Sequence, residues 1–276
     1  MTDPTTIQDL PRLKGRYPFR IGVTSYVFED HLLPNVQALA PYADDVELVL
    51  FESEDVCNLP STADIVQLRA IADANALSYT VHFPIDKPLG KSAPSEDRRA
   101  LQHILRVIDL TRPLAPYAFL LHLNGIKHDA GPADVRRWQA RLLPLLREIA
   151  TAVVEPQRIC LENLDYPFEW CDPLIEACGF SVCTDAGHLW AADYDWRAHA
   201  ARYRAQTRVI HLYGTTGGQE HVSLAVMDRH LVVAFLQAMA PIQGVLTLET
   251  FGLAPSASSM EVLEACLAES QEAALC

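Results

Sequence analysis

The sequence predicts an α/β protein built as a closed (β/α)8 barrel in a single domain. Short β-rich runs alternate with segments of helical period along the chain. The runs are almost continuously apolar, which is typical of a parallel sheet covered by helices. Eight such units in 276 residues fit a closed barrel better than an open doubly wound sheet. No G-x-G-x-x-G follows any strand, so the dinucleotide-binding alternative lacks its signature.

Strands are expected where β-branched and aromatic residues cluster between turn residues. The eight predicted runs are residues 19–27, 45–51, 78–84, 117–124, 158–164, 180–185, 207–214 and 244–251. Residues 1–18 are interpreted as an N-terminal extension and residues 19–276 as the barrel, with the site at its C-terminal face. No linker, low-complexity tract or short repeat divides the chain, which predicts one domain.

Three helices between these strands have recognisable ends. Ser61 and Ser95 are predicted N-caps, because each precedes a segment of helical period. In the second of these helices the apolar residues form one stripe: Leu101, Ile104, Leu105 and Ile108. A compact third helix is expected with Asp172 as its cap, Pro173 at its first position and Gly179 as its stop.

Composition narrows the class of partner. The net charge is −13, from 22 Lys and Arg against 35 Asp and Glu, so long duplex nucleic acid would be repelled. The first residues contain no apolar signal-peptide core, and no run is long enough to cross a bilayer, which predicts a cytoplasmic protein. The seven cysteines form no C-x-x-C pair, which favours reduced thiols without a catalytic or metal role. We therefore expect a small-molecule partner and neither nucleic acid nor membrane.

Polar residues interrupt the apolar strands at one recurring place. In "SYTVHFP", His82 stands between Val81 and Phe83, and because neighbours in a strand face opposite ways, His82 points into the barrel. The same construction gives further inward or strand-end residues: His122, Glu162, Asp185, His188, His211 and Glu249. All lie near the carboxyl ends of their strands, where barrels of this class build their sites.

Such a set cannot be buried without partners, because an unpaired ionised group costs several kcal/mol. Divalent metal ions resolve the problem, since imidazole and carboxylate are ligands of zinc, manganese and iron. A lone histidine in a strand is more often an ordinary core residue, but repetition in six strands favours a metal cluster. No role is assigned to the other histidines: His31, His103, His128, His199 and His230.

The segments "VHF", "LHL", "LEN", "TDAGH", "IHLYG" and "LET" stand in the order found in the xylose isomerase-like TIM-barrel superfamily, which the chain resembles from about residue 19 to residue 251. In the sugar epimerases and isomerases of that superfamily, residues matching Glu162, Asp185, His211 and Glu249 bind one ion. The resemblance implies that the two glutamates, Glu162 and Glu249, take part in catalysis.

The endonuclease IV branch of the superfamily adds histidines matching His82, His122 and His188 and carries three zinc ions. Its Asp-x-His element corresponds here to "GGQEHVSL", which supplies His221 but puts Gln219 at the Asp position, with Glu220 as a substitute ligand. This resemblance implies two or three zinc ions, with manganese as the other candidate. It also implies attack on phosphorus by a metal-bound hydroxide, with Glu162 bridging two ions.

Longer segments, among them "PFRIGVTSYVF", "YTVHFPIDKPLG" and "GQEHVSL", resemble bacterial cobamide remodelling phosphodiesterases. The resemblance implies hydrolysis of the phosphodiester in the nucleotide loop of a cobamide, leaving a cobinamide-type corrinoid. Lys87 after the third strand and Tyr26 and Glu29 after the first are candidate substrate contacts, and residues 52–55 share this rim. Thr80, one layer below His82, is a candidate supporting residue.

Three other functions remain open at this stage. A sugar or sugar-phosphate isomerase or epimerase with one ion would leave His82, His122 and His188 without a chemical role. An abasic-site DNA endonuclease needs a basic rim, which the acidic composition disfavours. A metal-dependent binding module would retain its ligand without turnover.

Overall fold

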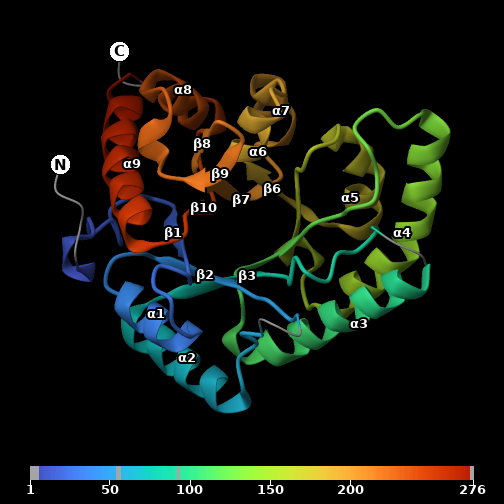
Figure 1. Cartoon of the computed structure of the whole chain (residues 1–276), viewed down its shortest axis with the longest axis horizontal. Coiled ribbons are helices and arrows are strands. Elements are labelled where there is room, and N and C mark those ends of the chain that lie inside the picture. Colours follow the sequence, from blue (N-terminus) through green and yellow to red (C-terminus); the bar gives the residue numbers. More distant parts are fainter. Residues whose placement is uncertain (1–5, 54–56, 92–93, 274–276) are drawn as a thin grey trace.

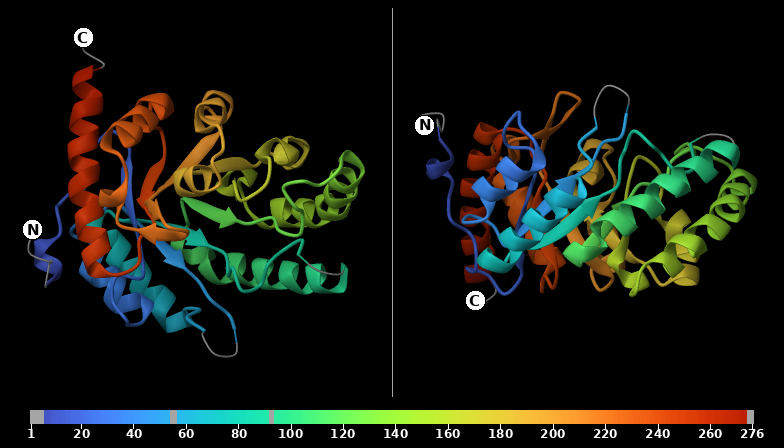
Figure 2. Two further views of the ribbon diagram at one scale, coloured as in Figure 1. Left: turned by 45° about the horizontal axis from the view of Figure 1, so that its top comes forward. Right: turned by 90° about the horizontal axis from the view of Figure 1, so that it is seen from below.

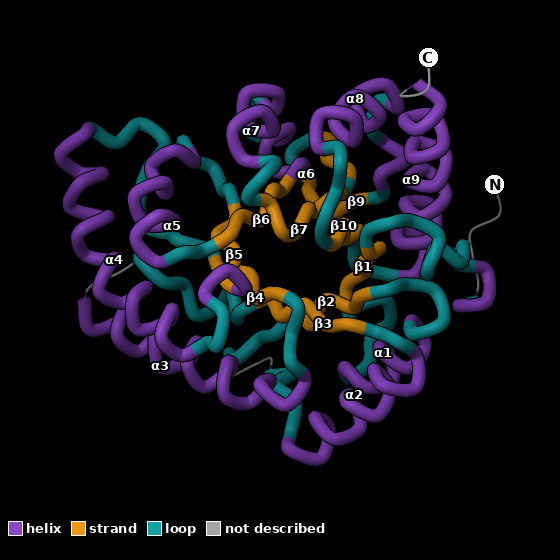
Figure 3. Tube along the Cα trace, turned by 180° about the vertical axis from the view of Figure 1, so that it is seen from behind, coloured by secondary structure: helices purple, strands orange, loops and turns teal. Residues whose placement is uncertain are grey.

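The computed structural model describes residues 6–53, 57–91 and 94–273, apart from the side chains of residues 271–273, and shows eight parallel strands closed into a barrel. Around the barrel the strands run in the order β1-β10-β7-β6-β5-β4-β3-β2, and Figure 3 shows them as a ring inside the helices. The strands are β1 (Arg20–Thr24), β2 (Asp45–Val49), β3 (Ser78–His82), β4 (Ala118–Leu121), β5 (Ile159–Glu162), β6 (Ser181–Asp185), β7 (Thr207–Leu212) and β10 (Val245–Leu248). The predicted (β/α)8 barrel is therefore confirmed, and each strand lies within one predicted run.

Helices surround the ring on all sides (Figure 1). They are α1 (Leu32–Leu39), α2 (Thr62–Asn75), α3 (Pro94–Thr111), α4 (Pro132–Ala152), α5 (Asp172–Cys178), α6 (Ala186–Ala191), α7 (Trp196–Tyr203), α8 (Arg229–Met239) and α9 (Leu253–Ala273). The described residues also form five short 3-10 helices: Ile7–Asp9, Arg112–Leu114, Pro156–Arg158, Phe168–Cys171 and Leu224–Val226. Within the described ranges, no helix is long and apolar enough to cross a membrane.

Two of the predicted helix starts are wrong by one or two residues. Ser61 caps α2 as expected, accepting a hydrogen bond from the Asp64 backbone N–H at 3.2 Å. Ser95, in contrast, lies inside α3, which already begins at Pro94. Asp172 is the first residue of α5 and Pro173 the second, because Cys171 already has helical backbone angles at the cap position. The Asp172 carboxylate instead accepts a hydrogen bond from the Tyr203 hydroxyl at 2.7 Å. Gly179 ends α5 as predicted, with φ 69°.

The interior of the barrel is sealed below the site. Small and apolar side chains fill its middle: Ala118, Leu120, Cys160, Cys183 and Val209. At its amino-terminal end, Arg20 and Arg208 pack on the ring of Tyr117, with their guanidinium carbons 4.6 and 4.1 Å from the ring centroid. The barrel is thus a filled core that is accessible to ligands from the carboxyl ends of its strands.

Residues 6–18 pack against the outside of the barrel near α9 (Figure 2). Leu10 and Leu13 are buried in the main core. Lys14 donates hydrogen bonds from Nζ to the carbonyls of Ala40 and Ala43 at 2.9 and 3.0 Å, and Arg16 forms an ion pair with Glu264 of α9. The segment is held by contacts to both early and late parts of the chain.

A short antiparallel hairpin, β8 (Gly214–Thr216) and β9 (Gln219–Val222), follows β7 and is not expected from the sequence. Its turn is formed by Gly217 and Gly218, with φ 56° and 80°. These strands are short and polar, so they lack the apolar alternation that identifies the barrel strands. The hairpin projects the "QEHV" segment back over the barrel end.

Candidate metal centre

The predicted site residues lie together at the carboxyl ends of the barrel strands. His82, Glu162 and Asp185 are the last residues of β3, β5 and β6. His122 and Glu249 directly follow β4 and β10, and His211 is the second-last residue of β7. The apolar neighbours of these residues, such as Val81 and Leu212, point outward into the main core, as strand alternation requires.

Glu162 lies at the centre of this group, and each of its oxygens faces two histidines. Oε1 is 3.1 Å from Nε2 of His122 and 3.6 Å from Nδ1 of His188. Oε2 is 3.7 Å from Nε2 of His82 and 3.6 Å from Nδ1 of His211. Glu162 thus lies within 4 Å of four imidazoles, and its carboxylate is shared by the whole group.

A deep set of ligands is closed off from solvent. Glu162, Asp185, His211 and Glu249 are each at most 5% exposed, and their ligand atoms all lie within 4.8 Å of one another. Four of these buried atoms have no hydrogen-bond partner among the residues that the structure describes, namely Glu162 Oε2, Asp185 Oδ2, His211 Nδ1 and Glu249 Oε2. Because unsatisfied buried polar atoms are costly, convergent oxygens and imidazole nitrogens of this kind fit a divalent cation.

An outer set of histidines surrounds this deep set. The side chains of His122, His188 and His221 are 21%, 17% and 28% exposed. His82 and His122 form one possible ligand group with Glu162, and His188 and His221 form another with Glu220. The extra histidines therefore extend the site from the barrel interior toward its mouth.

Three of the imidazoles are oriented by a hydrogen bond to a backbone carbonyl. Nδ1 of His82 lies 2.9 Å from the Phe83 carbonyl, Nδ1 of His188 2.9 Å from the Asn163 carbonyl, and Nδ1 of His221 3.2 Å from the Glu249 carbonyl. A carbonyl can only accept, so Nδ1 carries the proton in each neutral ring and Nε2 keeps its lone pair. Metal-ligating histidines are commonly held in this way.

Asp185 serves both the helix that follows it and the site. Its Oδ1 accepts a hydrogen bond from the His188 backbone N–H at 2.6 Å and so caps α6, while Oδ2 lies 3.5 Å from Nδ1 of His211. Gly187 allows α6 to pack closely, because a Cβ there would be 2.0 Å from the Tyr213 ring. The "TDAGH" segment thereby fixes Asp185 and His188 relative to each other.

The hairpin positions the last predicted ligand. His221 has a positive φ of 56°, and its ring lies 4.2 Å from that of Tyr213 between centroids. Glu220 is exposed on the same strand, and its ligand atom lies within 4.8 Å of those of His188 and His221. Gln219 is exposed at the start of β9. Within the hairpin, the structure therefore brings Glu220 beside this pair of histidines.

The histidines and carboxylates of the cluster shift one another's pKa values toward the charged forms. Burial alone would lower the pKa of His82 and His188, but the surrounding carboxylates outweigh it and raise each pKa to about 9. Burial would likewise raise the pKa of Glu162, yet His122 and His211 hold it well below its usual range. A metal ion that binds His82 and His188 must therefore displace protons from their imidazoles at neutral pH.

Glu47 is a member of the centre that the strand-end pattern does not predict. It lies inside β2, is fully buried, and places Oε2 2.9 Å from Nε2 of His211. The ring of His211 is thereby held between Glu47 and the deep carboxylates. The sequence does contain the same pattern in "DVELV", where Glu47 stands between two apolar residues as His82 does. Glu47, however, lies one layer below the strand ends.

A groove beside the centre contains two of the three predicted substrate contacts. Tyr26 and Glu29 line a cavity of about 770 Å³ together with Phe251. The Phe251 ring lies 6.2 Å from that of Tyr26 and 5.2 Å from that of His221, which connects the groove to the centre. Lys87 does not line this groove, but lies close enough to His103 for its charge to lower the pKa of that histidine, in addition to the larger effect of burial.

The predicted rim after the second strand lies only partly within the described residues. Glu52 contacts α3, with Oε2 2.8 Å from Nδ1 of His103 and an ion pair to Arg106. Glu54 and Asp55 lie outside the described residues, as does Cys276. Of the other cysteines, Cys57 is exposed and five are buried. One of these, Cys183, lies beneath Glu162 and His211, with its thiol within 4.8 Å of their ligand atoms.

Comparison with known proteins identifies similar folds. The sequence profile of the xylose isomerase-like TIM barrel family matches residues 37–266. A D-tagatose 3-epimerase-like protein superposes with a TM-score of 0.75 at 19% identity, over 93% of this chain and 100% of that one. L-Ribulose 3-epimerase follows with a TM-score of 0.69 at 16% identity, over 93% and 97% of the chains. A xylose isomerase domain protein from Planctomyces limnophilus gives 0.67 at 18%, over 92% and 98%. No curated protein matches the sequence.

Proposed function

The chain belongs to the xylose isomerase-like TIM barrel family, and from this premise we propose that it is a metal-dependent phosphodiesterase. Its proposed reaction is hydrolysis of the phosphodiester in the nucleotide loop of a cobamide, which yields a cobinamide-type corrinoid. One water molecule adds across one P–O bond, so a phosphate monoester and an alcohol are formed.

The observation that carries the proposal is the arrangement of histidines around Glu162. A single ion needs four to six ligands, and the deep set of Glu162, Asp185, His211 and Glu249 already provides that number of residues. The outer histidines face the other oxygen of Glu162 or lie near the mouth. They are best explained by further ions.

The residues divide into three proposed ligand groups. His82 and His122 would hold one ion with Glu162, the residues Asp185, His211 and Glu249 a second, and His188 and His221 a third, with Glu220 as an additional ligand. Divalent ions supply activated water near neutral pH and neutralise charge on phosphate oxygens. Glu162 and Glu249 are the proposed catalytic carboxylates, because both are buried and lie beside His122 and His221, outer histidines that would face the reacting phosphate.

The cobamide substrate is supported by the groove and by the sequence resemblance. The groove of about 770 Å³ is lined by the exposed aromatic rings of Tyr26 and Phe251, which suit a large flat ligand. The net charge of −13 disfavours a duplex nucleic acid as substrate. A small phosphodiester that enters from the groove would meet the outer histidines first.

A second candidate is a sugar or sugar-phosphate isomerase or epimerase with one ion. It is favoured by the completeness of the deep set, in which Glu162 and Glu249 could transfer protons on either side of a sugar carbon. Two of the similar structures are named as a 3-epimerase and a 3-epimerase-like protein. In this case His82, His122 and His188 would be dispensable.

Metal content and a variant at His122 separate the two candidates. Plasma mass spectrometry of protein purified without chelator should give two or three zinc-like ions per chain. His122→Ala should remove about one ion and lower cobamide hydrolysis by about 100-fold or more, because it removes a direct ligand. His230→Ala, an exposed histidine of α8, is the matched control and should change neither.

Two other results would reject part of the proposal. One ion per chain, together with unchanged metal binding in His122→Ala, would reject the multinuclear site and transfer the assignment to sugar isomerisation. Two or three ions with an unchanged cobamide, as judged by product mass, would retain the metal site and reject only the cobamide substrate.

A further inference from the structure

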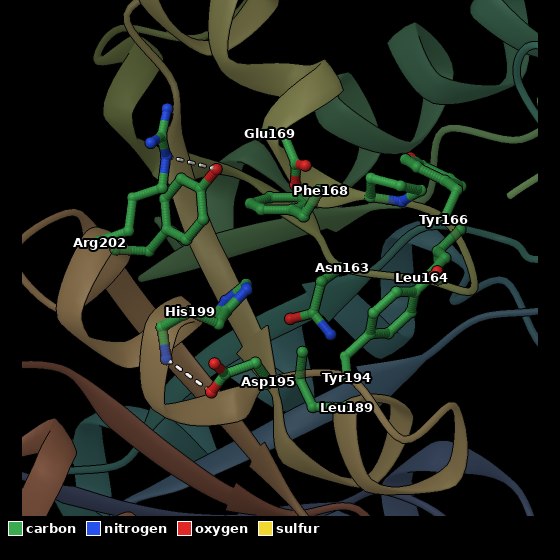
Figure 4. A pocket seen from close by; sticks show the side chains of 13 residues that line it. Asn163, Leu164, Tyr166, Phe168, Glu169, Leu189, Tyr194, Asp195, His199 and Arg202 are labelled. Atoms are coloured by element: carbon green, nitrogen blue, oxygen red, sulfur yellow. Dashed lines mark hydrogen bonds between the residues drawn. The ribbon is translucent and has the colours of Figure 1, made fainter. Parts of the chain in front are cut away.

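A second pocket lies outside the metal centre, behind the wall formed by Asn163. It has a volume of about 350 Å³ and is enclosed by the segment that follows β5, by α6 and by α7. The Asn163 side chain holds Asp185, accepting from its backbone N–H at 2.8 Å and donating one N–H to its carbonyl at 3.0 Å. Figure 4 shows the pocket with His199, Glu169, Phe168 and Tyr194 around it.

The hydrogen bonds around His199 determine which of its nitrogens is protonated. The Thr207 hydroxyl donates to the Tyr203 carbonyl at 3.0 Å, so it accepts from the Thr184 hydroxyl at 2.8 Å. The Thr184 oxygen, having donated its only proton, then accepts from Nε2 of His199 at 3.4 Å. His199 is therefore protonated at Nε2, and its Nδ1 is an acceptor. Within the described part of the chain Nδ1 has no hydrogen-bond partner.

His199 remains a neutral acceptor because it is buried. Only 7% of the residue is exposed, and this burial lowers the pKa of His199 to about 4. An imidazole that lines a pocket, with a lone pair that no described residue uses, can accept a hydrogen bond from a bound ligand. A ligand that binds here should accordingly bring an N–H or O–H group to Nδ1.

Apart from the Tyr194 hydroxyl and the second side-chain N–H of Asn163, which can donate, the remaining polar side chains of the pocket are acceptors or are already engaged. Glu169 is exposed, and its carboxylate forms no ion pair or hydrogen bond with any other described residue. Asp195 caps α7, accepting from two backbone N–H groups at 3.1 and 3.0 Å. Arg202 forms an ion pair with Asp172, and Nε of Arg202 donates to the Tyr203 hydroxyl at 3.0 Å. Among the described residues that line it, the pocket is thus negative at its mouth and has no free cation of its own.

Flat apolar side chains form the walls. The Phe168 and Tyr203 rings lie 5.5 and 4.7 Å from the His199 ring between centroids. Tyr194 lies close enough to Glu169 for the charges of Asp165 and Glu169 to raise the pKa of its hydroxyl, after the larger effect of burial. Aromatic faces beside carboxylates are the surroundings that organic cations prefer.

We propose that this pocket binds a small organic cation with a flat apolar body, such as an aryl amidine or an aromatic amine. The cationic group would pair with Glu169, one N–H would donate to Nδ1 of His199, and the flat body would pack against Phe168 and Tyr194. The site is separate from the metal centre and does not depend on the proposed phosphodiesterase activity.

Benzamidine is a suitable probe, with benzamide as its neutral isostere and benzoate as its anionic one. Isothermal titration calorimetry on the full metal-loaded chain should show saturable benzamidine binding, about tenfold or more tighter than that of either isostere. Glu169→Gln should weaken benzamidine by about fivefold or more and leave benzamide unchanged. Glu176→Gln, an exposed carboxylate on α5, is the matched control and should bind benzamidine like the wild type.

Three results would overturn the proposal. They are the absence of saturable benzamidine binding at millimolar concentration, equal binding of all three probes, and unchanged affinity in Glu169→Gln. A measurement that needs no variant is ¹⁵N NMR of His199. It should show the proton on Nε2 and a shift of Nδ1 on addition of benzamidine, whereas a proton on Nδ1 would contradict the proposed acceptor.

Discussion

At the scale of single residues, the contact between Glu47 and His211 determines how the deep ligand is presented. Both side chains are fully buried, and 2.9 Å separates Glu47 Oε2 from His211 Nε2. A carboxylate in this position holds the proton on Nε2, so Nδ1 faces Glu249 at 3.0 Å with its lone pair free for an ion. Glu47 is therefore a positioning residue in our interpretation, not a ligand.

Glu47→Gln tests this role without changing the size of the side chain. We expect metal affinity to fall by about 10- to 100-fold, because an amide is a weaker partner for the imidazole N–H. Competition with a chromogenic chelator measures the affinity directly. Glu29→Gln in the groove should leave the affinity unchanged. Equal metal affinities for wild type and Glu47→Gln would show that the contact with Glu47 is not needed to position His211. Failure of the wild type to bind metal would contradict the metal centre itself.

His199 makes a second prediction at this scale, concerning acid stability. Its pKa is about 4 in the folded protein and 6.5 as the ordinary value. The folded state therefore binds the proton less readily, and stability from this group is full above pH 6.5 and is lost as the pH falls toward 4. Between pH 8 and pH 5 the loss should be about 2 kcal/mol.

Urea unfolding at the two pH values, compared between wild type and His199→Gln, isolates this contribution. The variant should be less sensitive to the pH change by that amount, while the metal ligands titrate identically in both proteins. An equal pH dependence in the two proteins would mean that His199 is not protected from protonation.

Residue identities in the site are largely predictable, because one rule of strand alternation applies to each. His82, Glu162 and His211 follow it at three strand ends, and the structure brings them together. Glu47 follows the same rule one layer deeper, where a buried glutamate has no counterpart among the strand ends. The Nε2 proton of His199 depends on Thr184 and Thr207, whose proximity only the folded chain reveals.

At the scale of elements, the β8–β9 hairpin is the part of the site that local geometry controls most strongly. Gly218 has φ 80° in its turn, and a Cβ at this position would have no other atom within 4 Å, so a substitution there acts through the backbone alone. Gly218→Ala should cost about 1 kcal/mol of hairpin stability. Because the hairpin carries His221, occupancy of the outer metal position should fall while the deep position remains filled.

Metal content per chain measures this effect, and Gly131→Ala is the control. Gly131 precedes α4 with φ −73° and its nearest neighbour would be 3.7 Å from a Cβ, so alanine fits there without strain. Full occupancy of all positions in Gly218→Ala would indicate that His221 does not bind an ion.

Sequence patterns predict the barrel strands but neither the start of α3 nor the β8–β9 hairpin. The eight barrel strands are recognisable because each combines β-branched residues with apolar continuity. The pattern puts the start of α3 at Ser95, since serine is a good cap, but Pro94 already has helical geometry at the first position. The hairpin escapes prediction because "TTGGQEH" carries no apolar period, so its pairing arises from the double glycine turn and its contacts with α6.

At the scale of the whole molecule, the metal centre joins most of the barrel. Most of its proposed ligands come from β3, β4, β5, β6, β7 and β10 or directly follow them, while α6 supplies His188 and β9 supplies His221. Bound ions would therefore link strands on opposite sides of the ring. A ligand that binds only the folded state stabilises it by about 2.7 kcal/mol at roughly 100 times its dissociation constant. For a chain of this size, the melting temperature should rise by about 5 °C or more on adding zinc.

Differential scanning calorimetry before and after chelation provides the measurement. Addition of zinc to the chelated protein should restore the higher melting temperature, and magnesium, which prefers oxygen ligands, should restore it less. Identical melting curves for chelated and zinc-loaded protein would contradict a centre that links the strands.

The strand order also has a consequence for biosynthesis. β1 pairs with both β2 and β10, so the ring cannot close until Glu249 has been translated, long after His82, His122 and Glu162. Those three come from consecutive strands that pair side by side and can meet in a nascent chain that is still growing. The first ion captured during synthesis is therefore expected at this early trio, and the deep position fills only when the last strand docks, so the two positions would sample the cell's metal supply at different times.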